Sequence, residues 1–146
     1  MQIRETISFE GKKGSKSVEA LIDTGAEVTL IPKSLADELI DEYLEKKLRL
    51  KSASGHVTEA NVAYMKVGFP SLNNISYVGE IAIIDNNDTI LIGLDILNAL
   101  NIHVDSKNRT IYLSNETLEA AKTGLAVVGG VALIGTVLYL LFGRRR

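Results

Sequence analysis

The sequence predicts a mainly β protein, a single small barrel with short helices, followed by one C-terminal transmembrane α-helix. Three observations predict this fold class. Short apolar runs are separated by turn residues at regular intervals, as in an all-β barrel. The chain has 146 residues, a length that suggests one domain. Residues 123–143 carry no charge, and a helix of roughly 20 such residues crosses about 30 Å of hydrocarbon.

The first half of the chain predicts a β-hairpin and a helix. Ile3 to Phe9 alternates apolar and polar residues, which is typical of a half-buried strand. Gly11 to Gly14 is a polar turn, and Val18 to Ile22 returns as the second strand. Pro32 suits the first turn of a helix. Apolar residues at helical spacing predict that this helix continues to about Lys46, namely Leu35, Leu39, Ile40 and Tyr43.

The second half predicts further hairpins. Two strands, Leu48 to Leu50 and Val57 to Val67, flank a tip of small residues, Ser52 to Gly55. Later turns, strands and one helix are expected in this order: a turn at Ser71 to Asn74, a strand from Ile75 to Ile84, a polar loop from Asp85 to Asp88, a short strand ending at Gly93, a helix that Asp95 helps to start, and a final hairpin of Ile102 to Val104 and Thr110 to Leu113.

The C-terminal part predicts a membrane anchor. Asn115 is the expected cap of a helix that continues into the apolar stretch. The expected organisation is a domain at residues 1–114, a juxtamembrane helix or linker at 115–123, a transmembrane helix at 124–143 and a basic tail at 144–146.

Composition excludes several classes of protein. The chain has no cysteine, which excludes disulfides and thiol catalysis. Its two histidines, His56 and His103, are far apart in sequence, so no metal site is expected, and no cofactor-binding pattern is present. The final three residues are arginines, and the remainder has 13 basic against 18 acidic residues. Such a domain is not a nucleic-acid binder by charge.

Two motifs carry the chemistry. The first is Asp23-Thr24-Gly25-Ala26, which directly follows an apolar run. A glycine lets the backbone turn sharply, and the threonine hydroxyl can hydrogen-bond the backbone and lock the loop. Alone, this is also an ordinary turn sequence. The second motif is the run from Ile90 to Leu97, another short apolar strand that ends at a glycine.

Together and in this order, the two motifs resemble those of the retropepsins, the single-domain aspartic proteases of retroviral type. The segment Thr29-Leu30-Ile31-Pro32 fits as well, and the resemblance covers Val18 to Leu113. It implies an acid-protease barrel with the following site: a catalytic Asp23 in an active-site loop with Thr24, Gly25 and Ala26; a substrate-binding flap with Ser54 and Gly55 at its tip; and a second glycine motif with Gly93 and Asp95.

The mechanism that this resemblance implies needs two carboxylates that share one proton. The chain has only one Asp-Thr-Gly and is too short for a two-lobed enzyme. We therefore expect a homodimer in which Asp23 of each copy meets on a two-fold axis. The resemblance assigns the pairing of subunits to Ile3 to Phe9 and Thr110 to Leu113. Apolar residues such as Ile31, Val57 and Ile84 suggest hydrophobic substrate pockets.

The expected function is membrane-anchored aspartic endopeptidase activity on a peptide or protein substrate, and the anchor favours a membrane-associated one. The chain departs from the retroviral pattern: Glu27 is in the usual acidic position, but Leu94 replaces its arginine partner and Asp95 stands where asparagine is common. A cellular or prokaryotic relative, with a differently braced dimer, fits this better than a viral enzyme.

Two other functions stay open. One is a non-catalytic retropepsin-like module that binds peptides at the lipid bilayer, and the other is a membrane-tethered scaffold. The orientation is also open, because Arg144 to Arg146 favour a cytoplasmic C-terminus. The absence of a signal-peptide pattern near Met1 instead favours a domain that faces the cytoplasm, and we expect the latter.

Overall fold

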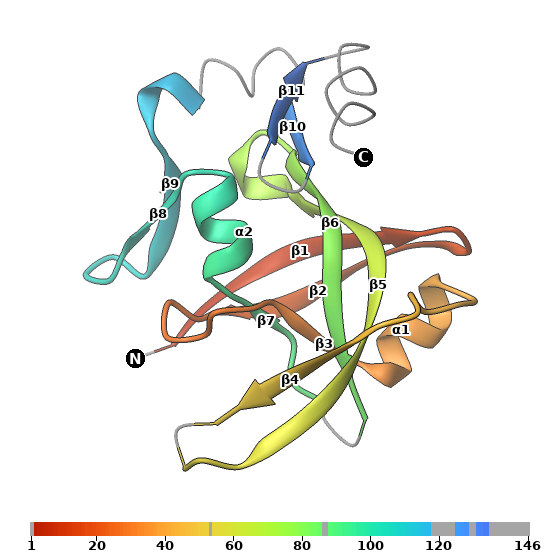
Figure 1. Cartoon of the computed structure of the whole chain (residues 1–146). Coiled ribbons are helices and arrows are strands. Elements are labelled where there is room, and N and C mark those ends of the chain that lie inside the picture. Colours follow the sequence, from red (N-terminus) through yellow and green to blue (C-terminus); the bar gives the residue numbers. More distant parts are fainter. Residues whose placement is uncertain (1, 53, 86–87, 118–124, 129–130, 135–146) are drawn as a thin grey trace.

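The computed structural model describes residues 2–52, 54–85, 88–117, 125–128 and 131–134 (Figure 1). Strands dominate, as the sequence predicted. The elements in chain order are β1 (Ile3–Gly11), β2 (Gly14–Ile22), β3 (Leu30–Pro32), α1 (Lys33–Leu39), β4 (Lys47–Lys51), β5 (Val57–Phe69), the 3₁₀ turn η1 (Pro70–Leu72), β6 (Ile75–Ile84), β7 (Leu91–Ile92), α2 (Leu94–Ala99), β8 (Ile102–Asp105), β9 (Thr110–Leu113), β10 (Leu125–Val128) and β11 (Val131–Ile134).

Six of these strands close into a barrel. The order around the ring is β1, β2, β7, β3, β6 and β5, and β5 pairs again with β1. The pairs β2–β7 and β3–β6 are parallel, and the other four are antiparallel. Several of these pairings are short: β1–β5 joins three residue pairs, β2–β7 two and β3–β7 one, so parts of β1 and β2 pair on one edge only among the described strands.

The core fills this ring. Ile7 and Phe9 of β1, which are two residues apart and so lie on one face of the strand, are both fully buried. Ile31, Phe69 and Ile92, from three other strands, are also at 0% exposure. The alternation seen in the sequence therefore marks the barrel interior, where burial of apolar side chains is the main stabilising contribution.

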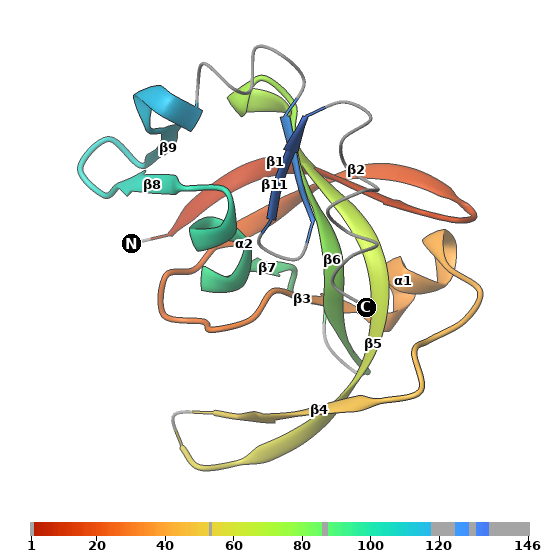
Figure 2. The same cartoon turned by 45° about the horizontal axis from the view of Figure 1, so that its top comes forward.

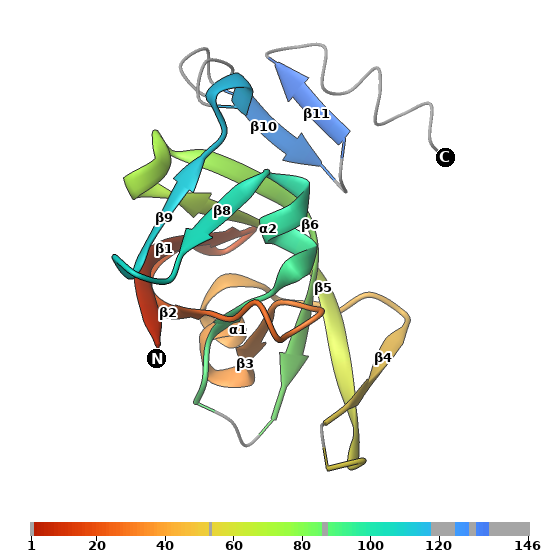
Figure 3. The ribbon, with the colours of Figure 1, turned by 90° about the vertical axis from the view of Figure 1, so that its left-hand side faces the viewer.

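Besides the β10–β11 pair, two hairpins extend beyond the ring. Strand β4 pairs only with β5, and this hairpin extends below the barrel in Figures 1 and 2. Strands β8 and β9 form a separate two-stranded sheet, which lies beside α2 in Figure 3. The predicted strands of both hairpins are confirmed. The predicted turn at Ser71 to Asn74 lies between β5 and β6, and Asn73 within it has a left-handed conformation.

The predicted length of the first helix is wrong. Helix α1 ends at Leu39 and not near Lys46, and Ile40 is already extended. The turn between β1 and β2 ends the helix, because Lys13 N–H donates to the Leu39 carbonyl at 2.9 Å and Lys13 Nζ donates to the Asp37 carbonyl at 2.8 Å. Tertiary contacts thus override a helical pattern of apolar residues.

The C-terminal segment differs from the predicted transmembrane helix wherever it is described. Residues 115–117 are helical, but the cap is Ser114, not Asn115, since Thr117 N–H reaches the Ser114 hydroxyl at 3.4 Å. Strands β10 and β11 replace the helix over 125–128 and 131–134, and β10 runs parallel to β6. Two β-branched apolar runs around Gly129-Gly130 fit a hairpin as well as a helix, which explains the difference. The rest of the predicted anchor and basic tail lies outside the described residues.

Among the residues that the structure describes, none of the helices is both long enough and apolar enough to cross a membrane.

Candidate active site

Two loops meet at one end of the barrel, and we call them the floor loops: residues 23–29 after β2 and residues 93–95 after β7. Backbone hydrogen bonds hold the preceding strands together. Leu21 N–H donates to the Ile90 carbonyl and Asp23 N–H donates to the Ile92 carbonyl, both at 2.9 Å. Asp23 is therefore fixed at the point where β2 leaves the barrel.

The Asp23 carboxylate lies in a tight turn that is closed by hydrogen bonds to Asp23 itself. Oδ1 of Asp23 accepts the Gly25 N–H at 2.9 Å, and the backbone carbonyl of Asp23 accepts the Ala26 N–H at 3.2 Å. Asp23 is half-buried, whereas Thr24 and Gly25 are exposed. The expected lock by the Thr24 hydroxyl is not found, because this hydroxyl bonds to no residue that the structure describes. The backbone N–H of Gly25 orients the carboxylate instead.

Gly93 is required by the close approach of the floor loops. A Cβ at this position would lie 2.7 Å from both the carbonyl carbon and the carbonyl oxygen of Val28, and 2.8 Å from the Ala26 oxygen. These are backbone atoms that cannot move aside cheaply. The same approach lets Leu94 N–H donate to the Ala26 carbonyl at 2.8 Å. The second glycine motif thus holds the loop that carries Asp23.

Asp95 joins the floor loops through Thr29. Oδ1 of Asp95 accepts the Thr29 hydroxyl at 2.8 Å, the Thr29 N–H at 3.0 Å and the Ile96 N–H at 2.8 Å. The Thr29 hydroxyl in turn accepts the Gly93 N–H at 2.9 Å. Asp95 N–H adds a bond to the Glu27 carbonyl at 3.1 Å. This network braces the floor loops within one copy of the chain. It does so although Leu94 stands where the retroviral pattern has the arginine partner of Glu27.

The hairpin of β4 and β5 ends in the predicted tip. Ser52 N–H donates to the His56 carbonyl at 2.8 Å, and Gly55 N–H donates to the Ser52 carbonyl at 2.9 Å. Gly55 has φ +88, a conformation that favours glycine. The hydroxyls of Ser52 and Ser54 are 2.8 Å apart. Both predicted tip residues therefore lie in the turn itself.

A groove of about 650 Å³ separates the floor from the hairpin. Residues 25–28 and Leu30 line one side, and residues 48–52 line the other. Asp23 is not among the lining residues, but its neighbour Gly25 is. The expected pocket residues are corrected: Ile31 is fully buried in the core, and neither Val57 nor Ile84 lines the groove.

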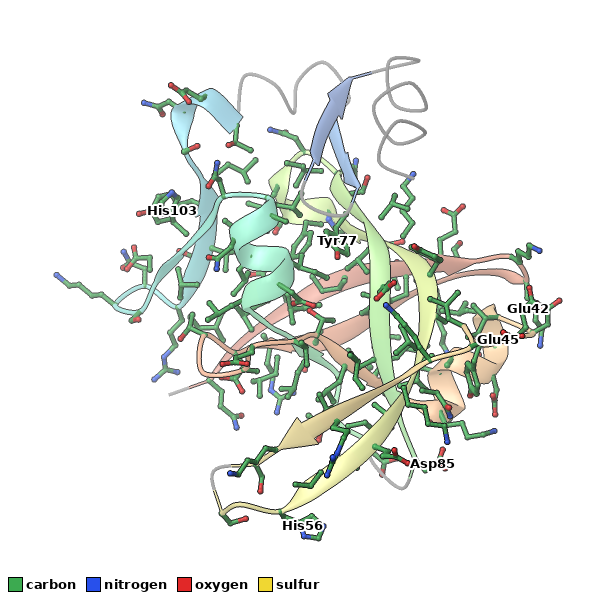
Figure 4. All side chains as sticks on the ribbon, viewed as in Figure 1. Glu42, Glu45, His56, Tyr77, Asp85 and His103 are labelled. Carbon is green, nitrogen blue, oxygen red and sulfur yellow. The ribbon has the colours of Figure 1, made fainter. Side chains whose placement is uncertain are left out.

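The histidines and carboxylates form no recognisable metal site. Figure 4 shows His56 pointing away from the barrel at the far end of the hairpin and His103 on β8, on the other side of the molecule. Within the described part of the chain, no group of three or more histidine, aspartate or glutamate side chains could hold a metal ion.

Sequence reasoning missed three residues of this region. Thr29 connects the floor loops, and a hydroxyl inside the apolar run Val28-Thr29-Leu30-Ile31 was the available signal. Arg49 and Lys51 line the groove. Their alternation with leucines in β4 could have shown that one face of the flap strand is basic.

Comparison with known proteins supports the motif analysis. A family model described as "gag-polyprotein putative aspartyl protease" matches residues 9–99, which include both floor loops and the whole β4–β5 hairpin. No curated protein matches the chain.

Proposed function

The chain belongs to the gag-polyprotein aspartyl protease family, whose model covers residues 9–99, and on this premise we propose that it is an aspartic endopeptidase with Asp23 as its catalytic residue. One observation carries the proposal. A half-buried carboxylate is held by a backbone N–H at the open end of a barrel, next to a groove large enough for an extended peptide.

The second carboxylate of the proposed dyad comes from another copy of the chain. Asp95 is the only other carboxylate with side-chain bonds in the floor loops that the structure describes, and both of its oxygens already accept hydrogen bonds from Thr29. It is a brace and not a proton donor for substrate. Thr24 and Gly25 are exposed beside Asp23, so they offer a surface on which the same loop of a second copy can pack around a two-fold axis.

The chemistry of such a dyad follows from repulsion between like charges. Two carboxylates about 3 Å apart cannot both ionise, so one stays protonated. The ionised Asp23 takes a proton from water as the water oxygen attacks the scissile carbonyl carbon. The protonated Asp23 of the other copy donates to the carbonyl oxygen. The C–N bond then breaks as the amine nitrogen takes the proton that Asp23 received from water, and the Asp23 of the other copy takes back a proton from a hydroxyl of the diol. An amine and a carboxylic acid are released, and the dyad again holds one proton.

Anchoring in a lipid bilayer is a second part of the proposal. An uncharged run over residues 124–143 followed by three arginines supports it, and it would favour membrane-associated substrates. Pairing of β10 with β6 is the competing arrangement. Alkaline extraction of membranes from expressing cells separates the two. A chain that stays in the pellet supports the anchor, and one released with peripheral proteins supports the strands.

The decisive test of catalysis compares full-length protein with Asp23→Asn on a mixed peptide library. Asp41→Asn, which changes an exposed aspartate outside the groove, is the matched control. We expect cleavage by the wild type and by Asp41→Asn, inhibition by pepstatin, and no cleavage by Asp23→Asn. A rate that rises faster than linearly with protein concentration supports the dimer. Peptide binding without cleavage in the wild type would instead favour the non-catalytic binding module.

A further inference from the structure

The wall of the groove formed by β4 is basic on one face. Along this strand, Lys47, Arg49 and Lys51 are exposed, and Leu48 and Leu50 are half-buried. Because successive side chains of a strand point to opposite faces, the three basic residues share one face and the two leucines share the other. Of the basic residues, Arg49 and Lys51 line the groove and Lys47 does not.

These groove cations form no ion pair with any residue that the structure describes. Arg4, Lys16, Lys33 and Lys46 each form an ion pair with a carboxylate. In contrast, neither Arg49 nor Lys51 forms one with any described residue, although the chain as a whole has a formal net charge of −2. Positive charge is thus left available at the groove beside the loop that carries Asp23.

The backbone of β4 is available as well. Among the described strands, β4 ends the sheet and pairs only with β5, so the N–H and C=O groups on its other edge pair with no described strand. An extended peptide can add to such an edge as a further strand. Its side chains would then lie opposite those of β4, on alternating faces.

We propose that the groove selects extended substrates in which two acidic side chains flank a branched apolar one. This inference rests on the proposed function, since it takes the groove to be the substrate-binding groove. The acidic side chains at alternate positions lie on the face of Arg49 and Lys51, and the apolar side chain between them lies on the face of Leu48 and Leu50.

Two carboxylates near the groove, those of Glu27 and Glu59, restrict where an acidic substrate side chain can bind. Glu27 lines the opposite wall, and it repels an acidic side chain placed toward the floor. Glu59 is opposite Arg49 in the β4–β5 register, yet forms no ion pair with it among the described contacts. The acidic substrate residues are therefore bound at the outer edge of β4, and the floor side accepts apolar or basic residues.

The test measures binding separately from cleavage. Full-length Asp23→Asn protein is titrated into three fluorescent peptides that differ only at two positions, with cores Glu-Leu-Glu, Gln-Leu-Gln and Lys-Leu-Lys, and Kd is read from anisotropy. Two exposed ion pairs predict that the acidic peptide binds about fivefold more tightly than the neutral one, with a smaller difference in high salt.

Two charge reversals in the same background complete the test. The double change Arg49→Glu and Lys51→Glu should reverse the order, so that the lysine peptide binds best. Lys47→Glu reverses a positive charge on the same strand face but outside the groove. It should leave the preference for the acidic peptide unchanged. Equal affinity for all three peptides, or an equal effect of Lys47→Glu, would overturn the proposal and leave the basic row as protection of an edge strand.

The outcome is independent of the proposed catalysis. If the wild type never cleaves but these preferences hold, the acidic-substrate inference stands for a binding module and the protease function fails. If Asp23-dependent cleavage is found and is indifferent to Arg49 and Lys51, the function stands and this inference fails.

Discussion

The floor loops and the hairpin arm, which we define as residues 47–61, face each other across the groove but are built in opposite ways. The floor is cross-braced: Thr29 is fully buried and bonds to both Asp95 and Gly93. In the arm, β4 pairs with β5 alone, and the turn closes on itself between Ser52 and His56. The bonds of Thr29 to Asp95 and Gly93 join residues distant in sequence, whereas the bonds between β4 and β5 join the two strands of one hairpin.

This difference assigns separate tasks to the two regions. The catalysis that we propose, by a pair of carboxylates, requires fixed geometry, and the buried floor network is suited to provide it. Recognition of an extended peptide requires an edge that can receive it, and a hairpin with few tertiary contacts opens at low free-energy cost. Substitutions in the floor should therefore lower global stability, and substitutions in the arm should change substrate handling with little effect on unfolding.

The largest expected effect tests the close approach in the floor. Gly93→Ala places a methyl group against backbone atoms of Val28, so we expect the free energy of unfolding to fall by about 3 kcal/mol, with loss of activity. Urea unfolding followed by circular dichroism measures it. Gly68→Ala is the control, because its Cβ would lie 3.7 Å from the nearest atom, Ser8 Cβ. Equal stability of the two variants would contradict a braced floor.

The hydroxyl of Thr29 should have the next largest effect. Thr29→Val keeps the shape but leaves the Gly93 N–H and one Asp95 bond without this partner. A loss of about 2 kcal/mol in unfolding free energy is expected from the unsatisfied buried groups. Thr29→Ser retains the hydroxyl and should keep most of the unfolding free energy that Thr29→Val loses. If valine and serine behave alike in urea, packing and not hydrogen bonding connects the loops.

A substitution at the tip of the arm should change activity more than global stability. Gly55→Ala forces an alanine to φ +88 with no neighbouring atoms within 4 Å, so the cost of about 1 kcal/mol is conformational and local to the tip. We expect lower kcat/KM on peptide substrates and nearly unchanged urea unfolding. Gly55→Asn, which adopts positive φ more readily, should lose less activity. A large drop in global stability would show that the tip is part of the cooperative core.

The smallest effect concerns the root of the arm. The Tyr43 hydroxyl is buried without a hydrogen-bond partner among the described residues, and burial, followed by the charge of Asp37, raises its pKa above the ordinary 10.0. Tyr43→Phe removes an unsatisfied group, so stability should rise by about 0.5–1 kcal/mol.

The same substitution should change the response to alkaline pH. With a raised pKa, folding favours the protonated Tyr43, so this contribution to stability is complete below about pH 10 and is lost as the pH rises through the folded-state value. Thermal unfolding of wild type and Tyr43→Phe between pH 9 and 11 measures this. A parallel decline in both proteins would assign the alkaline effect to other groups.

The difference between local and long-range contacts also explains which features could be predicted from the sequence. Alternation of apolar and polar residues located β1, and apolar runs between turn residues located β6 and the β8–β9 hairpin, because both are local signals. The helix end at Leu39 was missed, because the atom that ends it belongs to Lys13 of a distant turn. In the site, Asp23, Gly55 and Gly93 were found through motif and turn chemistry, and the Asp95–Thr29 bond was not, since it joins loops far apart in sequence.

The insertion of β7 between β2 and β3 also determines when the site can form during synthesis. Leu21 and Ile22 pair with Leu91 and Ile92, and Leu30 with Leu91. Until that late segment leaves the ribosome, the barrel stays open and the loop that carries Asp23 lacks its hydrogen bonds to β7 and to the second floor loop. A nascent chain can form the β1–β2 and β4–β5 hairpins early. An incomplete chain therefore lacks the assembled site that we propose as catalytic, because the residues of β7 and the second floor loop are translated near the end of the matched domain.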